Sequence, residues 1–284
     1  MNDQPVLDGM PTRLYSAAPS RLTTYLDCPR RYRMTYLDRP QPPKGPPWAH
    51  NSIGSAVHSA LAKWWDLPEG RRTPEAGGTL VVSGWLSEGF RDDQQSLDAQ
   101  ERAREYVERY LHDVDPTVQP IGIERTVSLT TPRASLWGRV DRIDERPGEG
   151  VVVVDYKTGR SVLTVDDART SIALAVYAAA ATRTFRRPCT KVELHHLPTG
   201  EVVTWDHTDE SLHRHLRRAD SIAAELGDLD ARFKAGMTPE EADDAFPANV
   251  GALCGWCDFR SSCAAGRSVP AQRAWAAVEP RPES

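Results

Sequence analysis

Four consecutive valines, at positions 151–154, run directly into Asp155, Tyr156 and Lys157. An uninterrupted apolar run of this kind is typical of a strand buried on both faces, in the middle of a sheet that helices cover on each side. Side chains alternate along a strand, so Asp155 and Lys157 should share one face and Tyr156 should point to the other. The chain should therefore fold around a central strand that ends in an acid and a base.

Periodicity and turn residues divide the remainder into expected elements. We expect helices over Arg21–Leu37 with Ser20 as N-cap, Ile53–Trp65, Leu97–Val114, Asp167–Thr184 and Asp209–Ala235; strands over Ile121–Leu129, Ala134–Ile143, Val151–Tyr156, Lys191–Leu197 and Glu201–Trp205; a loop around Gly70–Gly78; and an acidic loop after the last helix. This order favours an α/β fold with a mixed sheet flanked by helices. It divides the chain into an N-terminal helical region (1–119), a core (120–208) and a C-terminal helix with a cysteine-rich cap (209–284), expected to behave as one cooperative domain.

Composition excludes several classes of protein. The chain has 284 residues, of which 39% are hydrophobic and 26% charged, as in globular rather than disordered or membrane proteins. The longest apolar stretch, Ser171–Ala181, is too short to span a bilayer. The polar and acidic Met1–Met10 segment does not resemble a secretory signal. We therefore expect a cytoplasmic protein with no membrane association.

The net charge of −5 does not indicate nucleic-acid binding, but positive charge is concentrated near the N-terminus. The stretch from Arg21 to Lys44, which includes Arg30 and Arg31, is strongly basic. Such a stretch can follow a phosphate backbone, or it can be an ordinary solvated helix face. Both interpretations remain open from this segment alone, and Arg30 and Arg31 are its candidate DNA-binding residues.

A second acidic residue lies where the preceding strand is expected, in Gly138-Arg139-Val140-Asp141. If the two strands are neighbours, Asp141 converges with Asp155, and two carboxylates with a backbone carbonyl form a hard oxygen site suited to Mg²⁺ or Mn²⁺. The nearby ammonium of Lys157 can orient a water molecule or stabilise transition-state charge. An isolated Asp-x-Lys is common as a salt bridge, so the ordered set with His58 is what carries this hypothesis.

Three motifs resemble those of the RecB-like PD-(D/E)xK nucleases. Gly54-Ser55-Ala56-Val57-His58 is similar to their G-x-x-x-H helix, Gly138–Asp144 to their G-x-x-D-R-I-D strand, and Asp155-Tyr156-Lys157-Thr158-Gly159 to their D-Y-K-T-G strand end. The likeness covers most of the chain in the family's order. It implies a restriction-endonuclease-like core and metal-dependent hydrolysis of DNA, as an exonuclease on single-stranded or end-containing DNA in repair or recombination.

The resemblance also implies roles for individual residues. His58, Asp141, Asp155 and the carbonyl of Tyr156 would bind the metal, and Lys157 would act on the attacking water. Glu124, on the preceding strand, is given less weight. Arg142 and Asp144 are expected to be surface charges or ion-pair partners.

A helix motif of the family, Q-x-x-x-Y, is only half present. Tyr177 matches its tyrosine, which implies contact with DNA, whereas Ala173 occupies the glutamine position. This departure concerns the handling of substrate and does not affect the expected metal site.

The cysteines form a second pattern. Cys28 precedes the core, and Cys254, Cys257 and Cys263 follow it as C-x2-C-x5-C, a spacing that indicates metal or cofactor ligands rather than disulfides. Four thiolates can hold an iron–sulfur cluster or a structural Zn²⁺, and the spacing alone leaves both open. The arrangement resembles the iron–sulfur staple of AddB-type and CRISPR-associated relatives, which implies a 4Fe–4S cluster. Cys189 is expected to be unpaired and buried.

Two alternative functions are consistent with the same sequence. One is a CRISPR-associated nuclease that trims DNA for spacer acquisition; the other is a catalytically weak DNA-binding module. The sequence contains no Walker A motif, so a helicase motor would have to come from a partner such as a helicase or another repair protein.

Overall fold

The computed structural model describes residues 14–278. Within them, one six-stranded mixed sheet has the order β1-β3-β4-β5-β6, with β2 paired to β3. The strands are β1 (Tyr15–Ala17), β2 (Gly122–Thr130), β3 (Ala134–Arg146), β4 (Gly150–Lys157), β5 (Lys191–His196) and β6 (Glu201–Asp206). The helices are α1 (Pro19–Asp27), α2 (Pro29–Tyr36), α3 (Ala49–Trp65), α4 (Pro74–Ser83), α5 (Asp93–His112), α6 (Val165–Arg169), α7 (Ile172–Phe185), α8 (Asp209–Gly236) and α9 (Pro239–Ala245). The predicted mixed sheet flanked by helices is confirmed.

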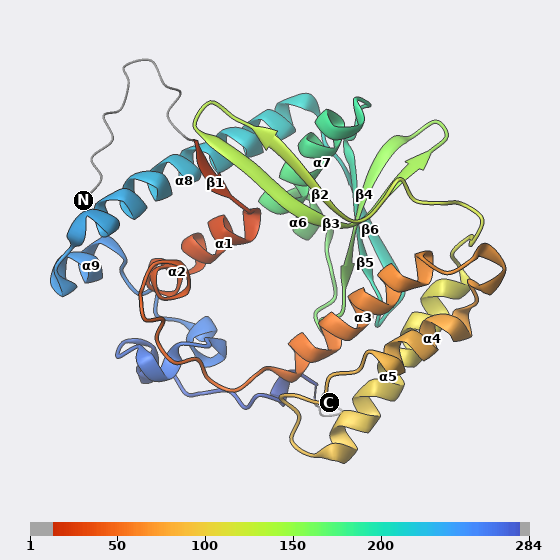
Figure 1. Cartoon of the computed structure of the whole chain (residues 1–284), viewed down its shortest axis with the longest axis horizontal. Helices are drawn as coiled ribbons and strands as arrows, with labels where there is room; N and C mark the ends of the chain where they lie inside the picture. The colour runs from red at the N-terminus through yellow and green to blue at the C-terminus, as the bar shows by residue number, and fades with distance from the viewer. Residues whose placement is uncertain (1–13, 279–284) are drawn as a thin grey trace, which may run out of the picture.

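Strand β4 is the buried centre of the sheet. It lies between β3 and β5, and all four of its valines are 0% exposed. Val151 and Val153 pack into a core shared with α1, α7 and α8, whereas Val152, Val154 and Tyr156 pack into a second core with α3, α4 and α5. These two helical layers lie on opposite sides of the sheet (Figure 1).

Strand β1 does not appear among the expected elements. It has three residues, too few to show a periodic pattern, and it pairs in parallel with the first residues of β3, Tyr15 with Ala134. Strand β1 belongs to the segment 1–119 and β3 to the segment 120–208, so the sheet joins these two segments. The core shared with α1, α7 and α8 contains residues from all three segments. Whether they unfold as one cooperative unit stays a prediction.

The single helix expected over Arg21–Leu37 is wrong. The chain forms α1 and α2, which meet at an extended Cys28 (φ −163°). Pro29 disfavours the helical conformation at the residue before it, which explains the break. Ser20 is not the N-cap either: α1 begins at Pro19, with Ala18 in the cap position.

The loop expected around Gly70–Gly78 is largely the helix α4. Thr73 caps it by accepting the N–H of Ala76, and Pro74 occupies its first turn. Its glycines reflect close packing against α5, because a Cβ at Gly77 would collide with Leu111 Cδ1. Here helix packing outweighs the low helix propensity of glycine.

Two other helices differ from expectation. The acidic loop contains α9, which a capping box between Thr238 and Glu241 begins. The helix expected over Asp167–Thr184 is divided into α6 and α7, and Ser171 caps the second of them. No helix in the described part of the chain is long and apolar enough to cross a membrane. The Met1–Met10 segment lies outside the described residues.

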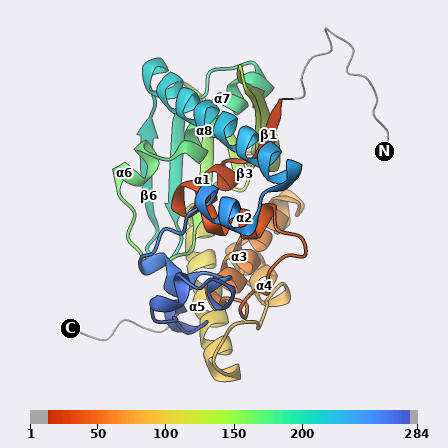
Figure 2. The same cartoon turned by 90° about the vertical axis from the view of Figure 1, so that its left-hand side faces the viewer.

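The N-terminal helices and the C-terminal segment lie side by side (Figure 2). Asn249 Nδ2 donates to the backbone carbonyl of Asp27, and the backbone N–H of Gly45 donates to the backbone carbonyl of Asp258. Trp48 Nε1 donates to the Asp258 carboxylate at 2.6 Å. The cysteine-bearing cap is thereby attached to the end of α1 and to the chain that leads into α3.

Candidate active site

The central feature of the site is a divergence between β3 and β4. Their ladder runs from Arg146–Gly150 to Arg142–Val154 and stops before Asp141 and Asp155. The backbone N–H of Tyr156, which has no β3 partner in the ladder, donates instead to Asp141 Oδ2 at 2.8 Å. The two strands thus hold both carboxylates at the point where the sheet opens.

A second strand adds another carboxylate beside Asp141. Glu124 lies on β2 between the paired residues Ile123 and Arg125, directly opposite Asp141 in the hairpin register. Its φ of 45° is in the left-handed region, which is uncommon for a residue with a side chain and costs about 1–3 kcal/mol. Strain of this kind is concentrated at functional sites, because the surrounding structure must impose it.

Helix α3 supplies the histidine. His58 Nδ1 lies 3.4 Å from Asp141 Oδ1. Donor atoms of His58, Glu124 and Asp141 all lie within 4.8 Å of one another, and this trio lines a hollow of about 530 Å³. One imidazole and two carboxylates in this arrangement form a donor set that suits a divalent cation.

Asp155 and Lys157 form an ion pair beside this trio. Lys157 Nζ lies 2.5 Å from Asp155 Oδ2, and Tyr156 between them turns into the α3–α5 core, as the strand period predicts. Burial raises the pKa of Asp155; Lys157 opposes this effect and the charge of Asp141 adds to it. The side chain of Lys157 is 45% exposed and can therefore reach a substrate.

Three carboxylates crowd the site, and Arg139 pairs with one of them, its Nε lying 2.7 Å from Glu124 Oε2. Burial raises the pKa of Glu124, and the charge of Asp141 raises it further. Burial by itself would lower the pKa of His58, but the hydrogen bond and charge of Asp141 raise it. Crowded carboxylates of this kind favour either a proton or a cation.

A family model of the PD-(D/E)XK nuclease superfamily matches residues 16–264 of the sequence. The chain belongs to this superfamily. A solved structure of a candidate exonuclease from Eubacterium rectale shares 15% identity with it, over 79% of this chain and 83% of the other, with a TM-score of 0.48. The solved structure of a protein designated SSO0001 shares 12% identity over 91% and 90% of the two chains, with a TM-score of 0.37. A search of curated proteins found no match.

The structure of this PD-(D/E)XK chain places most of the expected residues together. His58 and Asp141 meet, and Asp155 and Lys157 lie next to them. Glu124 belongs to the close trio, although the sequence analysis gave it less weight. The sequence did contain a signal for the position of Glu124. Counting residues back from the Thr131–Arg133 turn along the two strands of the hairpin places Glu124 opposite Asp141. For Tyr156 the structure shows its N–H at Asp141, and the predicted role of its carbonyl stays a prediction.

The glycine of the G-x-x-D strand makes room for Tyr177. A Cβ at Gly138 would collide with Tyr177 Cε1, so only glycine allows the ring to lie directly over β3. Burial raises the pKa of Tyr177 to about 12, and the charges of Asp155 and Asp141 contribute. Tyr177 of α7 therefore lies near the carboxylates of Asp141 and Asp155. Its contact with DNA stays a prediction.

Arg142 and Asp144 are ion-pair partners, as expected, but Arg142 is not at the surface. It is 6% exposed; its Nε lies 3.0 Å from Asp144 Oδ1, and it donates to the hydroxyls of Tyr110 and Tyr156 at 3.0 and 3.2 Å. Arg146 bridges Asp144 to Glu193. This buried network holds the ring of Tyr156, whose backbone N–H holds Asp141.

The network predicts an acid-sensitive contribution to stability. Burial acts to raise the pKa of Glu193, but hydrogen bonds from His195 and Arg146 and the charge of Arg146 lower it to about 2. At pH values above 4.5, the ordinary glutamate pKa, ionised Glu193 therefore stabilises the fold. This contribution falls as the pH drops from 4.5 towards 2. We expect Glu193→Gln to lose about 2–3 kcal/mol of unfolding free energy at pH 7.

Urea unfolding at pH 7 and across the acid range measures this effect. The difference between wild type and Glu193→Gln should shrink as pH falls, whereas the exposed Glu210→Gln should differ little at any pH. A difference that is constant with pH would show that the Glu193 charge has no such role.

The basic N-terminal stretch is largely engaged within the protein. Arg21 donates to Asp230 at 2.8 Å, and Arg33 donates to Asp243 at 2.9 Å. Arg30 pairs with Asp243 and donates to the carbonyl of Phe246. These contacts attach α1 and α2 to α8, α9 and the residues after them, so this stretch is not a simple solvated face. DNA binding by Arg30 and Arg31 stays a prediction.

Three of the four cysteines expected to act together, Cys28, Cys257 and Cys263, lie where α2 meets the cap. Cys257 and Cys263 pack with Met34 of α2, and burial raises the pKa of Cys257, to which the charge of Cys28 contributes. Backbone N–H groups donate to the sulfurs of Cys28 and Cys263 at 3.4 and 3.3 Å. Within residues 14–278, no three cysteine sulfurs lie within 4.8 Å of one another. Cys189 is buried in the main core, away from this group.

Proposed function

We propose that the chain is a metal-dependent deoxyribonuclease whose active site is the divergence of β3 and β4. The observation that carries this proposal is the convergence there of His58, Glu124 and Asp141, next to the Asp155–Lys157 pair. Hard oxygen donors with one imidazole suit Mg²⁺ or Mn²⁺. Burial raises the pKa of Glu124 and the charge of Asp141 adds to this effect, and a bound cation would offset both.

Each residue has a distinct role in this proposal. His58, Glu124 and Asp141 bind the cation, with Asp155 and the carbonyl of Tyr156 as further ligands. A bound cation would polarise the phosphate and make a bound water more acidic. Lys157 orients the attacking water or stabilises charge on the phosphate oxygens, and Asp155 holds its ammonium in place.

The proposed substrate is DNA, and the proposed mode is exonucleolytic cleavage of single strands or strand ends in repair or recombination. The sequence resemblance to RecB-like nucleases supports this choice. Tyr177, a half-buried ring near the carboxylates, supports it too, because bases stack on aromatic side chains. Ala173 in place of glutamine predicts a different contact one helical turn away.

Cleavage of end-labelled single- and double-stranded DNA tests this function. The full chain should cut with Mn²⁺ or Mg²⁺ and not with EDTA, and the label position should give the polarity. Lys157→Met should lower the rate about 100-fold, because the charge that stabilises the transition state is lost. Lys234→Met, on the exposed end of α8, is the matched control and should cut normally. Absence of metal-dependent cleavage of any DNA would reject the proposal.

We further propose that Cys28, Cys254, Cys257 and Cys263 bind a 4Fe–4S cluster. The N–H groups that donate to two of the sulfurs would stabilise thiolates, and the cap already packs against Met34 of α2. A tetrahedral Zn²⁺ would hold its sulfurs about 3.8 Å apart, as the Zn–S bond length requires. The resemblance of the cysteine pattern to the iron–sulfur staple of AddB-type and CRISPR-associated relatives is what supports the larger cluster.

Metal analysis of anaerobically purified protein distinguishes the two. We expect iron and acid-labile sulfide, with broad visible absorbance, and no stoichiometric zinc. Cys28→Ser should lose the cluster and lower Tm by roughly 5 °C, because the joint between the cap and α2 weakens. Cys189→Ala is the control and should keep its iron. Stoichiometric zinc without iron would show that the site is a zinc site.

A further inference from the structure

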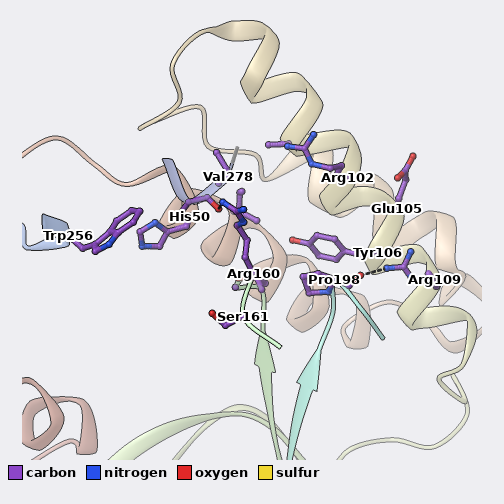
Figure 3. Close-up of a pocket in the computed structure, with 15 residues that line it drawn as sticks. His50, Arg102, Glu105, Tyr106, Arg109, Arg160, Ser161, Pro198, Trp256 and Val278 are labelled. Atoms are coloured by element: carbon purple, nitrogen blue, oxygen red, sulfur yellow. Dashed lines mark hydrogen bonds between the residues drawn. The ribbon is translucent and has the colours of Figure 1, made fainter. Parts of the chain in front are cut away.

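A second cavity also borders α3, at His50 and Ile53, next to the residues of that helix that line the metal-site hollow. It encloses about 640 Å³, within the range of small-molecule sites, between α3, α5, the loop after β4 and the final described turn (Ala276–Val278). His50, Tyr106 and Trp256 contribute to its lining (Figure 3), and Ile53 belongs to the same lining. Most of this lining is apolar and aromatic, which suits a flat and weakly polar group.

Two buried polar atoms in the wall lack partners. Among the described residues, neither Tyr106 Oη nor His50 Nδ1 has a hydrogen-bond partner, and Tyr106 is only 9% exposed. The Tyr106 hydroxyl points into the cavity towards Arg160 (Figure 3). A buried hydroxyl without a partner costs about 1–3 kcal/mol, so its position is one where a ligand atom would be bound.

The rim of the cavity is positively charged. Arg102, Arg109 and Arg160 line it, with Glu105 as the acidic member. Two of these arginines are fixed by backbone carbonyls: Arg109 donates to Pro198 at 2.9 Å and Arg160 to Ala276 at 3.2 Å. An apolar, aromatic interior beneath fixed guanidinium groups matches a nucleobase that carries a phosphate.

The cavity adjoins the proposed catalytic centre. His50 and Ile53 of α3 line it, whereas Gly54 and His58 of the same helix line the metal-site hollow. Thr158 also lines it and follows Lys157 directly in the chain. A Cβ at Gly54 would lie 3.4 Å from Thr158 Oγ1, so α3 and the loop after β4 meet closely at the boundary between the two spaces.

We propose that this cavity binds an unpaired base of the DNA substrate beside the metal site. The proposal rests on the nuclease function and defines its substrate further. A base within a duplex must be unstacked and unpaired before it can enter a pocket, so the cavity favours single-stranded or frayed DNA. The Tyr106 hydroxyl binds the edge of the base, and the arginines bind its phosphate.

The test uses the full-length chain in EDTA, with oligo(dT) that carries one 2-aminopurine at successive positions. One position should show a marked fluorescence change, and single strands should bind at least tenfold more tightly than the corresponding duplex. Tyr106→Phe should weaken oligo(dT) binding about fivefold without lowering Tm, because the removed hydroxyl has no protein partner. Ile53→Trp should weaken binding further by filling the cavity, and Tyr25→Phe, whose hydroxyl bonds Glu225 on another part of the surface, should bind normally.

Unchanged binding and fluorescence in both Tyr106→Phe and Ile53→Trp would overturn the proposal. Displacement by dTMP as efficient as by oligo(dT) would identify a free nucleotide as the occupant and would also overturn it. If these binding effects appear but no metal supports cleavage, the base site stands and the nuclease function fails. If the wild type cleaves and the variants bind normally, only the base site fails.

Discussion

Asp141→Asn should abolish metal-dependent cleavage while leaving the fold intact. Asp141 receives the N–H of Tyr156, lies 3.4 Å from His58 and faces Glu124 across the hairpin. Asparagine keeps the size and can still accept the N–H, but it removes the negative charge that would bind the cation. We expect a rate loss of about 10⁴-fold, equivalent to about 5 kcal/mol of transition-state stabilisation.

Two measurements separate loss of charge from loss of structure. Titration with Mn²⁺ should show weaker binding by Asp141→Asn, and its Tm should not fall, because like-charge repulsion with Glu124 is relieved. Asp228→Asn, on the exposed surface of α8, is the matched control and should cleave and bind Mn²⁺ as the wild type does. An Asp141→Asn protein that cleaves at more than a tenth of the wild-type rate would remove Asp141 from the active site.

Arg142→Met should cause the largest loss of stability among single changes near the site. The methionine side chain fits the apolar surroundings but leaves Asp144 with one cationic partner and two buried tyrosine hydroxyls without their donor. Breaking a buried ion pair by removing one partner costs about 3–5 kcal/mol. We expect a loss near 4 kcal/mol and a fall in Tm of roughly 10 °C.

Arg104→Met on α5 is the matched control for this change. Arg104 pairs with Glu101 and Glu108 at 2.6 Å, but at the surface, where water screens such pairs and they contribute little to stability. Urea unfolding of both variants gives the comparison. If Arg142→Met is no more destabilising than Arg104→Met, the buried network does not hold β3 and β4 in place.

Mn²⁺ affinity reports on the functional consequence of the same network. Arg142 contacts the hydroxyl of Tyr156, and the N–H of Tyr156 positions Asp141. Looser packing of Tyr156 should therefore weaken Mn²⁺ binding in Arg142→Met even at temperatures where the protein is folded. Arg104→Met should leave that affinity unchanged.

Local sequence patterns determined the centre of this protein. The valine run predicted a strand buried on both faces, and the two-residue period placed Asp155 and Lys157 together with Tyr156 turned away, as the structure has them. These inferences succeeded because the strand period and the burial of apolar runs act over a few neighbouring residues. The family motifs extended the same local information to His58 and Asp141.

Tertiary structure alone decided features that depend on distant segments. Strand β1 exists because β3 offers it an edge more than a hundred residues later in the chain, and α4 tolerates its glycines because α5 packs closely on them. The arginines near the N-terminus are engaged because α8 and α9 present acidic partners. No periodicity encodes such pairings, since they depend on which surfaces meet after folding.

The site itself shows the same division. The sequence determined that Asp155 and Lys157 end one strand and that Asp141 lies on its neighbour, although Asp141 falls in the middle of β3 and not at the strand end that the sequence suggested. Only the folded chain decided that β3 and β4 part at Asp141 and that Glu124 adopts a positive φ opposite it. Backbone divergence and strain arise from how the sheet twists and packs, and the residues that experience them carry no local signal.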